Sequence, residues 1–545
     1  MPKNRPVLGL SLESVDYTLL RQWMNEGRLP HLQKLFNSGF HARLESLPHS
    51  RAEIIQTVAI TGATPEISRY WGIHNYNPSS YRVTHGGIYD YKHRPPYFAL
   101  GPEYRVAAID MPQFNFHDNI HGWQIRNWGC HSPMTPTDSR PENLSRELDE
   151  EFGVPPIRTH DFSVLQDAKD MQRMIDNLHA GINLRTRMLS NLMDRGPWSL
   201  FLANCADMHK AGHYLVPNPD SVAVLGTVDP WGPLRRLHEH LDRSVGILME
   251  RFQDSWNLAV FSYEGIHPYS DEVPNTFLLA DLLMRDSFHG RGAFVYDDPG
   301  RGPSPESQAG IINWVMECWH LRRRPNAFQE WVKKCFGTSL SAALDAGLRL
   351  PPYPENPHKS VHCEYQPGMW LEKYRPYMRA FALPTFSDGL IRLNIRGRES
   401  RGRILPKHFQ EECSRLTSLL MDLKNPATGL AAVKAVIPIR DSPFQTGDDR
   451  PPADLVVQWH PPGDGNGFVS PTLGAFGPAP SLRASTHSPE GFFAACGPDI
   501  PQIREELSGS ILDIAPTLLD LVGANPPQPL EGRSLLPLSR DKSDR

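Results

Sequence analysis

The stretch VLGLSLESVDYTLLRQWMNEG, residues 7–27, contains the signature of a strand followed by a helix. Its first six residues form a short apolar run that is typical of a buried strand, and residues 17–26 then carry apolar side chains at helical spacing. Gly27 stands where a glycine commonly ends a helix, and Pro30 follows just beyond it. The stretch therefore predicts a buried strand that leads directly into an amphipathic helix.

Similar apolar runs recur along the chain, at residues 106–109, 199–203, 258–262 and 455–459. Helical patterns lie between them, around residues 165–195, 232–252 and 408–424. This alternation favours an α/β architecture with a largely parallel sheet. Because ligands of such sheets bind beyond the carboxyl ends of the strands, we expect the chemistry in the polar residues that follow Leu12, Ala203 and Ser262.

Residues 290–378 depart from this alternation. The region begins with closely spaced glycines and prolines, continues with tryptophans on helical patterns, and then contains the proline-rich stretch 351–357. We interpret it as an insertion or cap on the main sheet. The predicted division of the chain is a first core part, this cap, a second core part and a frayed tail, at residues 1–289, 290–378, 379–538 and 539–545.

The composition is that of a globular protein with a near-neutral charge. The 545 residues include 56 Lys and Arg against 61 Asp and Glu, a net charge of −5, which argues against a dedicated nucleic-acid binder. No run of about 18 apolar residues occurs, so we expect no membrane-spanning helix. The seven cysteines form no CxxC pair and the first residues match an export signal poorly, so we expect reduced thiols and a cytoplasmic protein.

The strongest candidate site is the sequence DMHKAGH, residues 207–213, directly after the predicted strand 199–203. Asp207, His209 and His213 fall within about one helical turn, where two imidazoles and a carboxylate can converge on one cation. His487, in a polar loop before an apolar run, is positioned to complete a three-histidine site of the kind that holds zinc with an open coordination position. Taken singly, these histidines would be ordinary surface or loop residues.

Two acidic residues also follow predicted strands. Glu13 follows the first strand, and Glu264 follows the strand 258–262. At the carboxyl ends of neighbouring strands, such carboxylates suit a second cation or an acid–base role. The alternatives are a helix N-terminal charge for Glu13 and a turn residue for Glu264.

Two further groups have a structural and a functional interpretation. Arg392, Arg396 and Arg398 alternate with apolar residues as on a strand, and they could meet an anionic substrate. We expect instead a solvated strand face with local ion pairs. The aromatic segment 70–81, which includes His74, either lines the mouth of the site or packs at the end of the sheet.

Together these pieces resemble the alkaline phosphatase superfamily, in its type I phosphodiesterase/nucleotide pyrophosphatase branch. The likeness covers most of the chain and rests on the order of its motifs, at residues 23–32, 60–65, 207–213, 260–266, 388–399, 486–492, 513–520 and 531–536. It implies a three-layer α/β/α sandwich with a mostly parallel central sheet and an inserted cap region. It also implies two metals that flank a Ser or Thr nucleophile and drive phosphoryl or sulfuryl transfer.

One of the two implied metal sites is kept. His213 and His487 match two of its histidines, and His209 stands where many relatives have Asp, with Asp207 nearby. Three imidazoles suit zinc, while a carboxylate-containing set also admits manganese or iron. We therefore predict a divalent metal, zinc first, with Glu13, Asp207, His209, His213 and His487 as candidate ligands.

The other metal site and the nucleophile depart from the family pattern. Glu13 stands where the family has Asp, and Ser262-Tyr-Glu-Gly265 replaces Ser-Asp-His-Gly, so both usual ligands of that motif are missing. The nucleophile position falls on Ala52, which carries no hydroxyl. Ser50 and Thr57 are the nearest hydroxyls, and Ser50 would need a two-residue shift in its loop.

Three interpretations fit this pattern. The first, which we favour, is a metal-dependent hydrolase of a phosphate ester or diester, acting on a small anionic substrate. Its nucleophile has moved to Ser50 or is replaced by metal-bound water, and Glu264 or Glu13 is the general base. The second keeps the fold and one metal for a different reaction on a non-phosphate substrate, in a specialised biosynthetic pathway. The third is a non-catalytic binding protein, against which the retained histidines argue.

Overall fold

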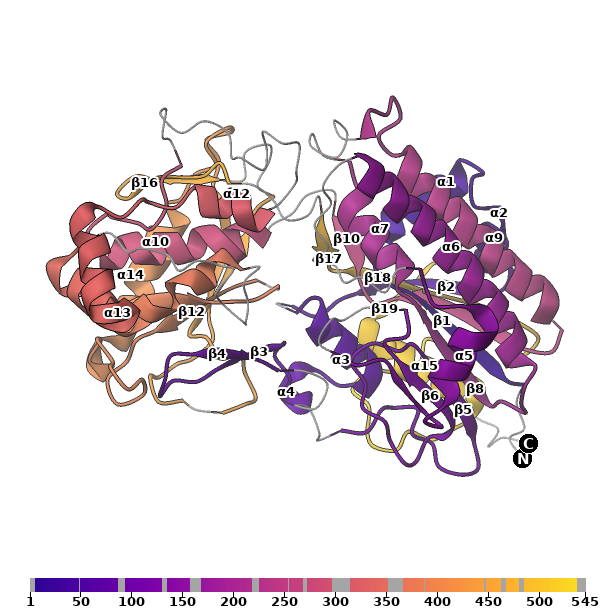
Figure 1. Ribbon diagram of the computed structural model, residues 1–545. Helices are drawn as coiled ribbons and strands as arrows, with labels where there is room; N and C mark the ends of the chain where they lie inside the picture. The colour runs from indigo at the N-terminus through magenta and orange to yellow at the C-terminus, as the bar shows by residue number, and fades with distance from the viewer. Residues whose placement is uncertain are drawn as a thin grey trace.

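The protein forms two lobes, which Figure 1 shows side by side in a computed structural model. The structure describes residues 5–48, 50–86, 94–129, 135–156, 168–217, 225–252, 254–267, 272–296, 314–350, 366–386, 388–445, 447–461, 467–479 and 485–536. The predicted tail at 539–545 and the proline-rich stretch 351–357 lie outside these residues. None of the helices in the described part is both long and apolar enough to cross a membrane.

The larger lobe is built on a central sheet in which the described residues form nine strands, in the order β19-β2-β18-β9-β1-β8-β5-β6-β7. The strands are β1 (Val7–Leu12), β2 (Phe40–Glu45), β5 (Arg105–Ile109), β6 (His121–Arg126), β7 (Asp138–Arg140), β8 (Leu200–Cys205), β9 (Asn257–Ser262), β18 (Glu490–Cys496) and β19 (Leu507–Ser510). From β6 through β5, β8 and β1 to β9 every pairing is parallel, while β18 and β7 run antiparallel to their neighbours. The predicted mostly parallel sheet is confirmed.

Helices cover both faces of this sheet. One face packs against α1 (Tyr17–Asn25), α2 (Pro30–Ser38), α5 (Leu144–Phe152), α6 (Ala168–Met193), α7 (Asp207–Leu215) and α9 (Gly232–Phe252). The other packs against α3 (Glu53–Thr61) and α15 (Ile514–Val522), with the short α4 (Pro65–Ser68) and η6 (Ile511–Asp513) beside them. Alternate residues of one strand enter the two cores, as Phe201 and Leu202 do. These two cores around one sheet make the three-layer sandwich.

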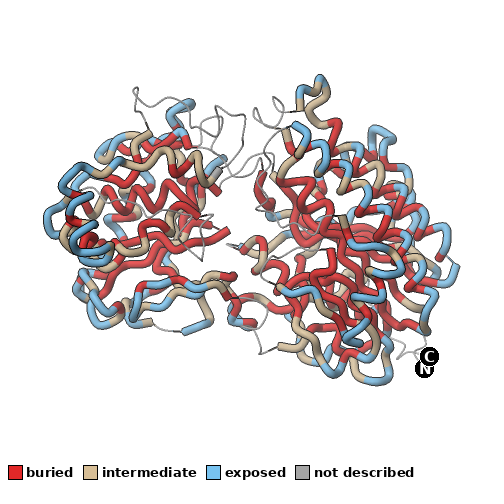
Figure 2. The backbone as a smooth tube through the Cα atoms, viewed as in Figure 1, coloured by how far each residue is buried: buried red, intermediate tan, exposed pale blue. Residues whose placement is uncertain are grey.

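The smaller lobe has its own antiparallel sheet, in the order β11-β12-β14-β13. Its strands are β11 (Ala380–Leu383), β12 (Gly389–Leu393), β13 (Val433–Pro438) and β14 (Leu455–Trp459), and the ribbon β15 (Phe468–Ser470) with β16 (Gly474–Phe476) lies beside them. Its helical elements are η1 (Pro274–Leu278), α10 (Leu279–Ser287), α12 (Trp314–His320), α13 (Ala327–Leu348), η3 (Pro367–Tyr377), η4 (Pro406–His408) and α14 (Phe409–Met421). Figure 2 shows a buried interior in each lobe.

The second hydrophobic core extends beyond the cap that the sequence predicts at 290–378. It includes side chains from Val273 to Ala479, together with Tyr81 and Val83 of the hairpin β3 (His74–Tyr76) and β4 (Val83–His85). Residues 380–459, expected in the second core part, supply strands that pair with one another and not with the central sheet. An apolar run predicts a strand, but it does not tell which sheet the strand joins.

Candidate metal centre

The carboxyl ends of three neighbouring parallel strands meet at one edge of the central sheet. Glu13 follows β1, α7 begins soon after β8, and Glu264 follows β9. The ribbon of β10 (Gly265–His267) and β17 (Thr486–Ser488) lies at the same edge, near α7 in Figure 1, and pairs His487 with Ile266. The topology thus carries residues from four distant parts of the chain to one place.

Three histidines meet at this edge. One ring nitrogen from each of His209, His213 and His487 lies within 4.8 Å of the others, and all three residues are buried. The ring centroids are 4.6 to 4.9 Å apart. His209 and His213 share a face of α7 because they are four residues apart. The structure therefore brings the three predicted histidines together.

Each of these imidazoles has an oxygen partner at Nδ1. His213 Nδ1 lies 3.0 Å from the backbone oxygen of Ser485, which can only accept, so Nδ1 carries the proton and Nε2 the lone pair. His209 Nδ1 is 3.3 Å from Glu13 Oε1, and His487 Nδ1 is 3.1 Å from Glu264 Oε1. A carboxylate or carbonyl at the second nitrogen is the usual support of a metal-binding histidine, since it fixes the ring and its tautomer. The three rings are thus held where one nitrogen from each can meet a common cation.

Ser14 joins two of these rings and was not singled out in the sequence. Its hydroxyl lies 3.1 Å from His209 Nδ1 and 3.3 Å from His487 Nδ1. The residue is buried and has a left-handed backbone, with φ of 59°, which a non-glycine residue adopts only at some cost. Its place directly after Glu13, in the polar cluster beyond the first strand, was the signal that could have identified it.

Glu13 is held from two sides by amide groups. Gln56 Nε2 donates to Oε1 at 2.9 Å, and Asn204 Nδ2 donates to Oε2 at 2.6 Å. Gln56 comes from α3 and Asn204 from β8, and sequence reasoning missed both. With His209 also at Oε1, the carboxylate is fixed against the ring.

Glu264 links the histidines to the start of α3. Its Oε2 accepts a hydrogen bond from the backbone N–H of Ala52 at 3.1 Å, while Oε1 faces His487. Burial raises the pKa of Glu264 to about 8, and the neighbouring His209 opposes that rise. The carboxyl group therefore binds a proton far more readily than an exposed glutamate.

Asp207 does not join the histidines. Its carboxylate accepts from Arg185 Nε at 3.1 Å and from the Cys205 thiol at 3.6 Å. The same arginine also donates to Asp110 at 3.0 Å, so Asp207 belongs to a buried ion-pair network. Asp207 lies two positions before His209 at the start of α7, so its side chain points to a different side of the helix than the side chains of His209 and His213.

The type I phosphodiesterase/nucleotide pyrophosphatase family model matches residues 7–317, more than half of the chain. The chain belongs to this family. Wild-type alkaline phosphatase PafA has the same fold, with a TM-score of 0.51 and 11% identity over 98% of this chain and 99% of that one.

Two other solved structures also match. They are phosphonoacetate hydrolase from Sinorhizobium meliloti 1021, at a TM-score of 0.47, 12% identity and 96% of both chains, and human ectonucleotide pyrophosphatase/phosphodiesterase 5, at 0.45, 12% and 97% of both. No curated protein matches the chain.

Ala52 stands at the position that the sequence predicts for the nucleophile. It is the N-cap of α3, with φ of 50° and ψ of −126°, and it belongs to a small apolar cluster with Tyr70, Ile73 and Phe386. The nearby hydroxyls are engaged elsewhere: Ser50 donates to the Pro48 carbonyl at 3.2 Å and Thr57 to the Glu53 carbonyl at 3.1 Å. Within the described residues, neither hydroxyl contacts the three histidines.

The donor set of this family member fits one divalent cation. Three buried imidazoles converge, and each has an oxygen at Nδ1 that holds its orientation. Three neutral imidazoles are a typical ligand set for zinc with an open position. The histidines would therefore hold the ion, with Glu13, Glu264 and the Ser485 carbonyl behind them.

Proposed function

We propose that this chain is a metal-dependent hydrolase that cleaves a phosphate ester or diester of a small anionic molecule. The observation that carries the proposal is the convergence of His209, His213 and His487, each supported by an oxygen at Nδ1. Membership of the type I phosphodiesterase/nucleotide pyrophosphatase family supports phosphoryl chemistry. The cytoplasm is the proposed compartment, which the free thiols of the described cysteines support.

The three imidazoles bind the cation in this proposal, with zinc as the preferred ion and manganese or iron as alternatives. When bound, a divalent cation supplies positive charge that stabilises the oxygens of a phosphoryl group during transfer. Glu13 and Glu264 act behind the histidines: they hold the rings and keep their Nδ1 protons in place.

The attacking group in this proposal is a water molecule, not a side-chain hydroxyl. Ala52 offers only a methyl group, and the hydroxyl of Ser50 is turned to the Pro48 carbonyl. Glu264 is a support and not the base for this water, because both of its oxygens already face donors, the Ala52 amide and His487 Nδ1.

The test starts with elemental analysis of the purified full-length protein. We expect about one equivalent of metal in the wild type and none in His213→Ala. Nitrophenyl phosphate monoesters and diesters are then assayed, and turnover should disappear in His213→Ala. A correctly folded wild type that neither contains nor binds a divalent metal would refute the proposal. If folded Ser50→Ala protein is inactive, Ser50 and not water is the nucleophile.

A second candidate is a different reaction on a non-phosphate substrate, with the same single metal. One contact favours it: Glu264 accepts the hydrogen bond of the Ala52 backbone N–H at the start of α3. An anionic group of a substrate would otherwise accept that hydrogen bond. Metal-loaded protein that turns over none of the phosphate esters above its His213→Ala control would support this candidate over the first.

A further inference from the structure

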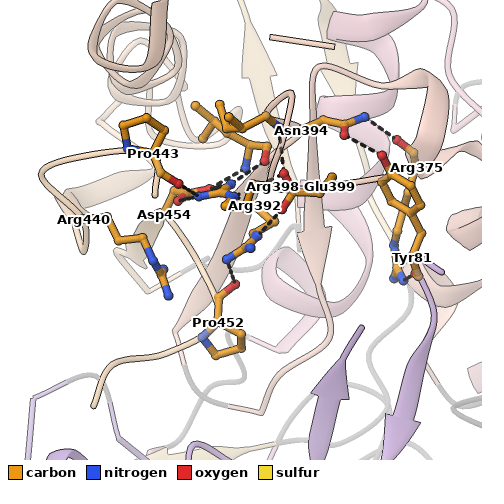
Figure 3. Close-up of polar contacts among 12 residues, drawn as sticks. Tyr81, Arg375, Arg392, Asn394, Arg398, Glu399, Arg440, Pro443, Pro452 and Asp454 are labelled. Carbon is orange, nitrogen blue, oxygen red and sulfur yellow. Dashed lines mark hydrogen bonds and ion pairs between the residues drawn. The ribbon is translucent and has the colours of Figure 1, made fainter. Parts of the chain in front are cut away.

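A dense set of arginines lies in the smaller lobe, around β12 and β14, as Figure 3 shows. Arg398 forms two bonds of 2.7 Å with the carboxylate of Asp454, and Arg392 donates to Glu399 at 2.8 Å. The side chains of Arg392 and Arg398 are only 9% and 5% exposed. The expectation of a solvated strand face is therefore wrong for these two arginines, since their charges are buried in paired form.

Arg440 is buried in the same region without a carboxylate of its own. Its Nε and Nη2 donate to the carbonyls of Gln445 and Pro451, each at 3.0 Å, and the residue is 5% exposed. Among the described residues, no hydrogen-bond partner meets its buried Nη1. Figure 3 shows Arg440 beside the Arg398–Asp454 pair with no dashed line joining it.

The charge around Arg440 is positive. Burial lowers its pKa to about 10; Asp454 opposes this, while Arg392 and Arg398 add to it. Asp454 is already engaged by both nitrogens of Arg398 and leaves Arg440 without a counter-ion. A buried cation is costly unless an anion is paired with it, so the site is suited to one.

A cavity of about 310 Å³ borders this guanidinium. Its lining includes the rings of Trp71, His74 and Tyr76, together with Asp448 and four further arginines. Each of these arginines has a carboxylate partner, in the pairs Arg69–Asp448, Arg392–Glu399, Arg398–Asp454 and Arg450–Asp449. The Tyr76 hydroxyl and His74 Nε2 are buried and, like Arg440 Nη1, meet no hydrogen-bond partner in the part of the chain that the structure describes. Burial lowers the pKa of His74 to about 3, so this ring is neutral. Three buried polar groups around one cavity thus remain to be satisfied.

A second, much smaller pocket shares part of this lining. This pocket is lined by Arg51 and Glu53, which flank Ala52, and by Trp71, His74 and Tyr76, which it shares with the Arg440 cavity. The two pockets therefore share part of their walls near the hairpin β3–β4.

We propose that the Arg440 cavity binds an oxyanion group, carboxylate or phosphate, of a small anionic molecule. Arg440 forms a charge-assisted hydrogen bond to that group, Tyr76 donates a second, and the ring of Trp71 flanks the rest of the molecule. Binding of this anion requires no turnover at the candidate metal centre.

The test measures anion binding directly by isothermal titration calorimetry with inorganic phosphate and with citrate, at low ionic strength. The full-length His213→Ala protein is the background, so that anions held at the metal centre do not contribute. Arg440→Gln should weaken binding of the preferred anion about ten-fold or more, and Tyr76→Phe should weaken it several-fold. Arg396→Gln, an exposed arginine next to the same strand, is the matched control and should bind as the background does.

Comparison of the two anions identifies the source, since a phosphate site prefers phosphate and a carboxylate site prefers citrate. Tyr76→Phe keeps the test valid if Arg440→Gln loses its thermal unfolding transition. Absence of binding, or binding that neither variant weakens, would overturn the inference. If anion binding depends on Arg440 but the wild type hydrolyses no phosphate ester, the inference stands and the proposed function is refuted. If the wild type hydrolyses phosphate esters but anion binding does not depend on Arg440, the proposed function stands and the inference is refuted.

Discussion

Glutamine at position 264 would test whether the carboxylates orient the histidines. Glu264 serves two donors at once, the Ala52 amide at Oε2 and His487 Nδ1 at Oε1, each at 3.1 Å. Glutamine has the same shape but only one acceptor oxygen, so one donor must face its NH2 group. The variant therefore keeps the volume of the side chain and removes one of the two bonds.

The expected loss follows from that single bond. A hydrogen bond to a charged group contributes about 1.5–3 kcal/mol, and every 1.4 kcal/mol corresponds to a factor of ten in a binding constant. Glu264 is buried, so salt screens the loss little. We therefore expect Glu264→Gln to bind zinc about 10- to 100-fold more weakly, the range seen when such supporting partners are removed.

Zinc affinity of the metal-stripped protein can be measured by competition with a chromophoric chelator. Glu45→Gln, at the exposed end of β2, is the control and should match the wild type. If Glu264→Gln binds zinc as tightly as this control, the carboxylate does not orient His487, and its role as a support is refuted.

Three further predictions concern other residues. Ser50→Ala should keep phosphoesterase turnover close to that of the wild type; an inactive but folded Ser50→Ala would contradict attack by water. Asp207→Asn should bind as much zinc as the wild type, but its free energy of unfolding should be lower by about 3 kcal/mol, because the charge of buried Arg185 is left partly unpaired. A variant that loses its zinc but unfolds at the same denaturant concentration as the wild type would contradict this. Burial lowers the pKa of His238 to about 4, below its ordinary value of 6.5, so its contribution to stability is complete above pH 6.5 and is lost as the pH falls through 4. Denaturant unfolding should show a steeper loss between pH 6.5 and 4 in the wild type than in His238→Gln, and equal slopes would refute it.

The sequence predicted the larger lobe well because its strands are buried on both faces. The runs at 7–12, 199–203 and 258–262 became β1, β8 and β9 within two residues at each end. The run at 455–459 is a strand too, but it pairs with β12 and β13 in the smaller lobe. Periodicity reports local structure and burial, whereas the partner of a strand depends on contacts far away in the chain.

In the candidate centre, the histidines and the two glutamates behind them could be predicted, whereas the rest of their support could not. The spacing of His209 and His213 fixes a shared helix face, and His487 followed from the motif order. The carbonyl of Ser485 carries no sequence signal, because every residue has one. Asp207 has the right residue type at the wrong helical phase, which only the exact start of α7 decides.

The ribbon of β10 and β17 has a consequence for how the protein is made. Most of the smaller lobe is inserted between its two strands, and His213 and the Ser485 carbonyl that supports it are 272 positions apart. At about 5–20 residues per second, a ribosome needs some tens of seconds to add that length. Throughout that interval the nascent chain carries two of the three imidazoles, so the set of His209, His213 and His487 is complete only once residue 487 has been made.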